Sequence, residues 1–189
     1  LLEQIAGNAE LGIRQYRLQN QEQEQFLIQA GRGSRLNYDA TLCMHELFEA
    51  TVEYRPDKQA ITYNDDSLTY RELNEQANRL ARYLVHQGVE PDSLVGIFLP
   101  RGIGTVIAIL AVLKAGGAYV PIDSKYPSSR VAYLLDDAGV EIVLTESALL
   151  CSLPEDGRTL VCLDDQAVMQ GLLTLDPTNL PKADLCLTS

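Results

Sequence analysis

The sequence contains 189 residues, of which 46% are apolar and 22% are charged, so its length and composition suit one main globular domain. Its formal net charge of -11 argues against a general binder of nucleic acids or anionic membranes, because the summed field repels phosphate. No apolar run approaches the ~20 residues needed to cross a bilayer. We therefore expect a soluble, cytoplasmic protein that binds neither nucleic acids nor membranes.

The first forty residues differ in composition from the rest of the chain. Residues 19–29 read QNQEQEQFLIQ, a polar segment with one small apolar patch. A segment with so few apolar residues cannot bury enough surface to fold alone. We expect residues 1–40 to form an extended linker that contains a short helix.

A helix is predicted over residues 41–54, with Asp39 or Thr41 as its N-cap. Two short strand-like runs follow, at residues 58–63 and 67–70, and the turn residues NDD separate them. This pattern is typical of a β-hairpin.

The predicted helix at residues 41–54 raises the alternative of a metal site. It contains His45, Glu46 and Glu49, and side chains four positions apart share a helix face. A zinc-protease helix needs a second histidine in this motif, however, and the only other histidine in the chain is His86. We expect no metal site here.

The clearest helix signal covers residues 70–87. Thr69 suits the N-cap, and Glu72 three residues later completes a capping box. Gly88 ends the helix, and Pro91 prevents its continuation. The predicted buried stripe contains Leu73, Ala77, Leu80, Ala81 and Leu84.

Another helix, over residues 103–115, is apolar on nearly every side, which indicates a buried position. Lys114 lies in its last turn, where a cation interacts favourably with the helix dipole, so we assign this lysine a structural role. The glycines at 116–117 can form the left-handed C-cap. The strand at residues 118–122 contains Pro121 and is therefore expected to lie at a sheet edge or to finish early.

Further strands are predicted at residues 93–99, 141–145 and 159–163, and a further helix ends at Gly139. Strands that alternate with helices over short connections favour right-handed crossovers. The predicted fold class is therefore α/β, a mainly parallel sheet with helices on its faces. In such sheets ligands bind beyond the carboxyl ends of the strands, and the last apolar fragment, residues 183–189, would reach that edge.

Three motifs resemble those of the adenylation domains of nonribosomal peptide synthetases, which are adenylate-forming, AMP-binding enzymes. LTYREL at residues 68–73 is similar to their first core motif, and LKAGGAYVPID at residues 113–123 resembles their second. HELFE at residues 45–49 resembles the opening of such a domain. The resemblance covers at least residues 43–147. Residues 1–38 also resemble the tail of a condensation domain and the linker that follows it.

This resemblance implies amino-acid activation. ATP and an amino acid would give an aminoacyl adenylate and pyrophosphate, and the acyl group would pass to the phosphopantetheine thiol of a carrier domain. Magnesium accompanies the nucleotide in this family. The implied organisation is a condensation-to-adenylation linker at residues 1–40 and the N-terminal part of an adenylation domain at residues 41–189. The implied partners are a condensation domain upstream, and the rest of the adenylation domain and a carrier domain downstream.

The family binds phosphate with a Ser/Thr/Gly-rich loop that contains a lysine, because backbone amides and hydroxyls can surround phosphate oxygens. Only Thr188 and Ser189 match the start of that loop, and Leu187 stands where a tyrosine is common. We take Thr188 and Ser189 as the candidate ATP-binding residues. We expect no catalytic residue and no metal ligand elsewhere, so the chain alone should be inactive and hold no cofactor tightly.

Two other functions remain open. A short protein could use this half-domain as a non-catalytic binding module, and the nucleotide sequence after Ser189 would separate that case from a fragment of a longer enzyme. An acyl-CoA or aryl-acid ligase of the same superfamily is less compatible with the second motif and with the leader.

The four scattered cysteines lack CxxC spacing and suit neither a zinc site nor a disulfide framework; they are Cys43, Cys151, Cys162 and Cys186.

Overall fold

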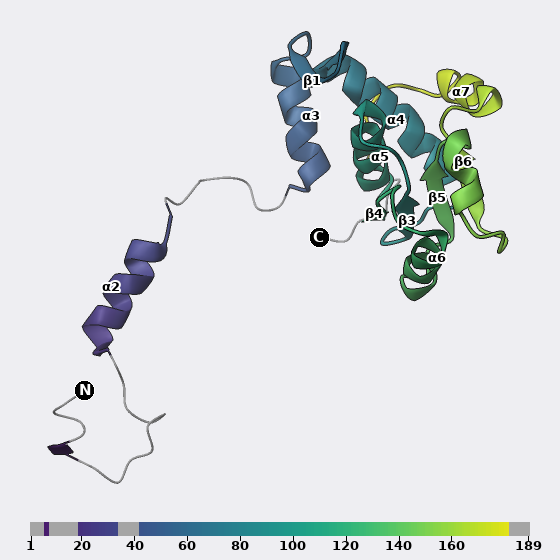
Figure 1. Cartoon of the computed structure of the whole chain (residues 1–189). Coiled ribbons are helices and arrows are strands. Elements are labelled where there is room, and N and C mark those ends of the chain that lie inside the picture. The colour runs from purple at the N-terminus through teal and green to yellow at the C-terminus, as the bar shows by residue number, and fades with distance from the viewer. Residues whose placement is uncertain (1–5, 8–18, 34–41, 182–189) are drawn as a thin grey trace. The chain divides into compact units, whose positions relative to one another are not determined.

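The computed structural model describes residues 6–7, 19–33 and 42–181 of the chain. The chain forms two units, residues 1–39 and 40–189 (Figure 1). Every helix in the described ranges is too short or too polar to cross a lipid bilayer.

The first unit contains one described helix of several turns, α2 (Gln21–Gly31). Its N-cap, Asn20, accepts a hydrogen bond from Gln23 N–H over 2.7 Å, and the Gln23 side chain accepts one from Asn20 N–H over 3.1 Å. None of the residues of α2 is buried within this unit. The predicted short helix in the leader is confirmed.

The second unit is an α/β fold (Figure 1). Its four-stranded sheet contains β3 (Leu94–Ile97), β4 (Ala118–Pro121), β5 (Ile142–Thr145) and β6 (Thr159–Cys162). A separate hairpin contains β1 (Gln59–Tyr63) and β2 (Asp66–Thr69), as predicted. The helices are α3 (Met44–Tyr54), α4 (Tyr70–His86), α5 (Ile103–Lys114), α6 (Ser128–Asp137) and α7 (Gln166–Leu173), with a 3-10 helix, η2 (Ser147–Ser152).

Both ends of α4 follow from local sequence chemistry. Thr69 N–H donates to Glu72 Oε2 over 2.8 Å, and Glu72 N–H donates to Thr69 Oγ1 over 3.2 Å, which is the predicted capping box. At the other end Gly88 has a φ of 94°, and Val89 N–H donates to the Leu84 carbonyl over 3.0 Å. The left-handed conformation of Gly88 allows this bond, which satisfies a carbonyl that the end of the helix leaves free.

The helix α5 ends with the same motif at its two glycines. Gly116 has a φ of 82°, and Gly117 N–H donates to the Val112 carbonyl over 3.0 Å. A Cβ on Gly117 would lie 3.0 Å from the Ser93 carbonyl oxygen, so the second glycine is required by close backbone approach. The C-cap predicted for this glycine pair is confirmed.

All four strands of the sheet run parallel in the order β4-β3-β5-β6. Val95 of β3 pairs with Tyr119 of β4 on one side and with Ile142 of β5 on the other. Among the described strands β4 lies at the edge, which is one of the two outcomes expected from Pro121, since proline has no N–H for a further ladder.

Different helices pack against the two faces of the sheet. Val95 and Ile97 belong to a core cluster that also contains buried residues of α4 and α5. Gly96 between them faces α6, because a Cβ at this glycine would lie 3.2 Å from Leu135. Phe98 and Val143 join α6 in a second core cluster. Helices therefore cover both faces of the sheet, as predicted.

The start of α3 differs from the sequence prediction. The helix begins at Met44 with Cys43 as its N-cap, and the predicted caps Asp39 and Thr41 lie outside the described residues. Cys43 N–H donates to Glu46 Oε2 over 2.7 Å, and this bond sets the start of the helix.

The helix α7 was not predicted, because it has only eight residues and contains a glycine, which disfavours a helix. Its N-cap, Asp165, accepts hydrogen bonds from Ala167 N–H over 2.8 Å and from Val168 N–H over 3.1 Å. The available sequence signal for the start of this helix was Asp165, an N-cap residue type three positions after the end of β6.

Candidate functional site

The strands of the sheet end at one edge, and their order places the topological switch point between β3 and β5. Asp164, which follows β6, accepts hydrogen bonds from Ser147 N–H over 2.8 Å and from Ser147 Oγ over 3.1 Å. The backbone bond is the main reason that the pKa of Asp164 lies below its ordinary value. Asp123, after β4, accepts from Lys125 N–H over 2.9 Å. These two carboxylates therefore order turns at this edge.

A cavity of about 560 Å³ lies beside the carboxyl ends of β5 and β6, between α4, α5 and α7. Apolar side chains form much of its wall, including Leu80, Ile107 and Leu172. Its charged lining contains four carboxylates and one guanidinium, from Glu72, Glu75, Glu146, Asp164 and Arg79. The excess of negative charge disfavours phosphate groups.

Within the described ranges, no group of three His, Cys, Asp or Glu side chains is arranged to hold a metal ion. Thr188 and Ser189, the candidate ATP-binding residues, lie outside the described residues.

Lys114 is buried rather than exposed at the helix end. Its side chain is 1% exposed, and its Nζ forms an ion pair with the Glu49 carboxylate. Burial lowers the pKa of Lys114, while the hydrogen bond and the charge of Glu49 act in the opposite direction. The ion pair gives Lys114 a structural partner beyond the helix dipole. It also gives Glu49, considered in the sequence as a possible metal ligand, a different role.

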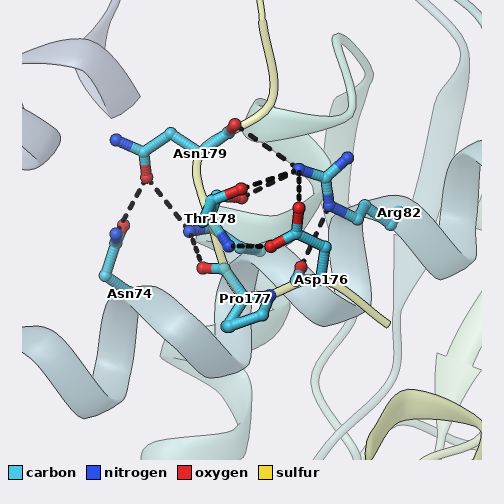
Figure 2. A network of polar contacts seen from close by, with 7 residues as sticks. Asn74, Arg82, Asp176, Pro177, Thr178 and Asn179 are labelled. Carbon is cyan, nitrogen blue, oxygen red and sulfur yellow. Dashed lines mark hydrogen bonds and ion pairs between the residues drawn. The ribbon is translucent and has the colours of Figure 1, made fainter. Parts of the chain in front are cut away.

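A polar network joins α4 to residues 176–179 (Figure 2). Asn74 Nδ2 and Asn78 Nδ2 donate to Asn179 Oδ1 over 2.8 and 3.0 Å. Arg82 lies one turn further along α4 and forms an ion pair of 3.7 Å with Asp176. The pKa of Asp176 lies below its ordinary value, chiefly because its carboxylate accepts a hydrogen bond from the backbone N–H of residue 178.

The sequence prediction missed this network. Asn74 and Asn78 each follow a residue of the predicted buried stripe, so a polar pair four positions apart on a buried helix face was the available signal. Their partner Asn179 lies 105 and 101 positions away in the chain, and no local pattern indicates such a pairing.

Comparison with known proteins identifies the family. The family of AMP-binding enzymes matches residues 48–185, which is more than half of the chain. The chain belongs to the AMP-binding enzyme family.

Two curated relatives of this AMP-binding chain are peptide synthases. Gramicidin S synthase 2 of Brevibacillus brevis is 39% identical over 171 residues, covering 90% of this chain and 4% of that protein. Bacitracin synthase 1 of Bacillus licheniformis is 36% identical over 168 residues, covering 89% of this chain and 3% of that protein. Among the first curated relatives that match, the chain spans between 2% and 6% of their length.

Solved structures agree with this AMP-binding assignment. The nonribosomal peptide synthetase FmoA3, in its AMPPNP-bound form, is 37% identical, with a TM-score of 0.65 over 72% of this chain and 14% of that one. An artificially fused adenylation–PCP di-domain from Klebsiella oxytoca, NpsA-ThdA, is 25% identical, with a TM-score of 0.65 over 73% of this chain and 25% of that one. The fold observed here is therefore that of the N-terminal subdomain of adenylation domains.

Proposed function

We propose that this chain is the N-terminal part of a nonribosomal peptide synthetase adenylation domain, which activates an amino acid with ATP as an aminoacyl adenylate. The observation that carries the proposal is the parallel sheet with its flanking helices, matched to FmoA3 at 37% identity over 72% of the chain. The same three motifs that carry the family resemblance lie on the elements that build this unit, namely α3, α4 and the segment from α5 to β4.

The proposed domain organisation follows the sequence prediction. Residues 1–40 form the condensation-to-adenylation linker, and residues 41–189 form the first part of the adenylation domain. A condensation domain upstream and a carrier domain downstream complete the proposed assembly, and the carrier's phosphopantetheine thiol receives the acyl group. The identity to gramicidin and bacitracin synthases, of which the chain spans only a few per cent, supports this multidomain context.

ATP and magnesium belong to the complete domain in this proposal. Thr188 and Ser189 begin the loop that binds the phosphates, and the described residues provide the scaffold behind it. The free thiols of the described residues Cys43, Cys151 and Cys162 suit a reducing compartment, which supports a cytoplasmic location.

Amino-acid-dependent exchange of labelled pyrophosphate into ATP tests the proposal. The complete natural protein that contains this chain should catalyse exchange with one amino acid or a small group of them, in the presence of magnesium. The 189-residue chain alone should not catalyse exchange, because it contains only the first two residues of the proposed phosphate loop, whose groups would stabilise the charge that develops in the reaction. Exchange by the chain alone would contradict the scaffold role.

Two further arms of the same experiment address the other functions. Exchange that depends on an aryl or fatty acid, and on no amino acid, would indicate an acyl ligase of the superfamily. If the complete natural protein gives no exchange with any acid, the adenylation proposal is wrong and the non-catalytic binding module is favoured.

A further inference from the structure

The helix α4 holds residues 176–179 through their backbone (Figure 2). Four successive carbonyl oxygens accept hydrogen bonds from two α4 side chains, and they belong to Asp176, Pro177, Thr178 and Asn179. Arg82 donates to the first over 3.0 Å, to the third over 3.1 Å and to the fourth over 3.5 Å. Asn78 donates to the second over 2.6 Å. Because these bonds are made to carbonyls, they determine the path of the chain.

The side chain of Asn179 is the meeting point of three donors. Its Oδ1 accepts from Asn74 Nδ2 over 2.8 Å, from Asn78 Nδ2 over 3.0 Å and from Lys114 Nζ over 3.5 Å. Lys114 in turn pairs with Glu49. The three sequence motifs thus converge here, since Glu49 belongs to HELFE, Asn74 to the helix that LTYREL begins, and Lys114 to LKAGGAYVPID.

This network is more polar than stability alone requires. Asn78 is 0% exposed and Asn74 is 8% exposed, and the Oδ1 atoms of both are buried with no hydrogen-bond partner among the described residues. A buried acceptor without a partner lowers stability, so an apolar pair at these positions would stabilise the fold at least as well. The asparagines contribute directional bonds, which favour one position of residues 176–179 over others.

We propose that Asn74, Asn78 and Arg82 are positioning residues that fix residues 176–179 and thereby the starting point of the chain that leads to Thr188 and Ser189. The proposal rests on the proposed function, in which these two residues begin the phosphate loop. Asn179 precedes Thr188 by nine residues, so a fixed Asn179 limits the positions that the loop can reach, and its release would widen them.

The test uses two substitutions and a matched control on the same helix. Arg82→Lys keeps the cation but removes the planar group that contacts three carbonyls, and Asn78→Ala removes the donor to residues 177 and 179. Arg71→Lys is the control, because Arg71 is exposed and pairs only with Asp57 among the described residues. Hydrogen exchange is measured on the 189-residue chain, and pyrophosphate-exchange kinetics with ATP on the complete natural protein.

The expected result has two parts. Amides of residues 180–189 exchange faster in both variants than in the control, and the KM for ATP rises about fivefold or more while the KM for the amino acid changes little. A merely structural role would lower the amount of active protein without separating the two KM values. Unchanged hydrogen exchange at residues 180–189, or equal changes in both KM values, would overturn the proposal. If the unsubstituted protein catalyses no pyrophosphate exchange, the adenylation proposal fails, and hydrogen exchange alone decides whether α4 anchors this segment.

Discussion

Glu49 and Lys114 form an ion pair across 65 positions of the sequence, and it joins α3 to the last turn of α5. The lysine side chain is 1% exposed and the glutamate side chain is 17% exposed. Removal of one partner from a buried pair leaves an uncompensated charge, which is more costly than replacement of both partners by apolar groups. The pair therefore links two sequence motifs at a single buried position.

The first prediction concerns the strength of this link. Glu49→Gln should lower the free energy of unfolding by about 3–5 kcal/mol, because Lys114 then lacks its counter-charge. Lys114→Met should cost less, since the partly exposed glutamate can still reach water. Denaturant unfolding of both variants and of the double variant measures the coupling. Strictly additive costs would show that the two side chains do not interact.

The same pair predicts a dependence on alkaline pH. Burial lowers the pKa of Lys114 from its ordinary value of 10.5, so the unfolded chain binds more protons than the folded one between the lowered pKa and 10.5. Stability from this group therefore rises as the pH increases through that interval. The rise should be steeper in Glu49→Gln, where the opposing charge is gone, and absent from the variant that also carries Lys114→Met. Thermal unfolding between about pH 7 and pH 10 in all three proteins checks this sign.

A third prediction concerns the glycine that follows the C-cap of α5. In Gly117→Ala the new Cβ would lie 3.0 Å from the Ser93 carbonyl oxygen and 3.2 Å from side-chain carbons of Val89 and Val112. Overpacking of this kind should destabilise the fold by about 1–3 kcal/mol. The control is Gly104→Ala near the start of the same helix, where a Cβ would meet no atom within 4 Å and stability should stay level or rise. Equal unfolding midpoints in the two variants would contradict the packing argument.

Acid should weaken the capping box of α4. The backbone hydrogen bond from Thr69 is the main cause that lowers the pKa of Glu72 from its ordinary value of 4.5. A carboxylate with a lowered pKa stabilises the fold above its ordinary pKa, and this contribution is lost as the pH falls through the folded value. Glu72→Gln should therefore be less stable than the unsubstituted chain at neutral pH and should lose less stability below pH 4.5. Parallel pH profiles of the two proteins would show that the charge of Glu72 plays no part.

Thiol reactivity gives a further test. Burial, followed by the charges of Asp164 and Asp165, raises the pKa of Cys162 above its ordinary value of 9.0. Since the thiolate is the reactive form, Cys162 should be alkylated severalfold more slowly than the exposed Cys151 at about pH 8. Peptide mass spectrometry after timed exposure to iodoacetamide measures both rates in one sample. Equal rates would mean that the surroundings of Cys162 open in solution.

Much of the secondary structure was determined by the sequence alone, because the signals are local. The capping box at Thr69 and the left-handed glycines at 88 and 116 act within one turn of the helices that they bound. Pro121 correctly indicated an edge position among the described strands, since a missing N–H has the same consequence in any sheet. The parallel arrangement followed from the alternation of strands and helices.

The tertiary structure decided which polar side chains meet. Asn179 lies 105 positions from Asn74 and 65 positions from Lys114, and each of the three has an ordinary local setting in the sequence. Their convergence depends on the packing of α4 against α5, which brings distant residues within hydrogen-bonding distance only after the sheet and helices have assembled. Local patterns report backbone geometry over a few residues, whereas a buried polar network is a property of contacts between elements, and these contacts arise only in the folded chain.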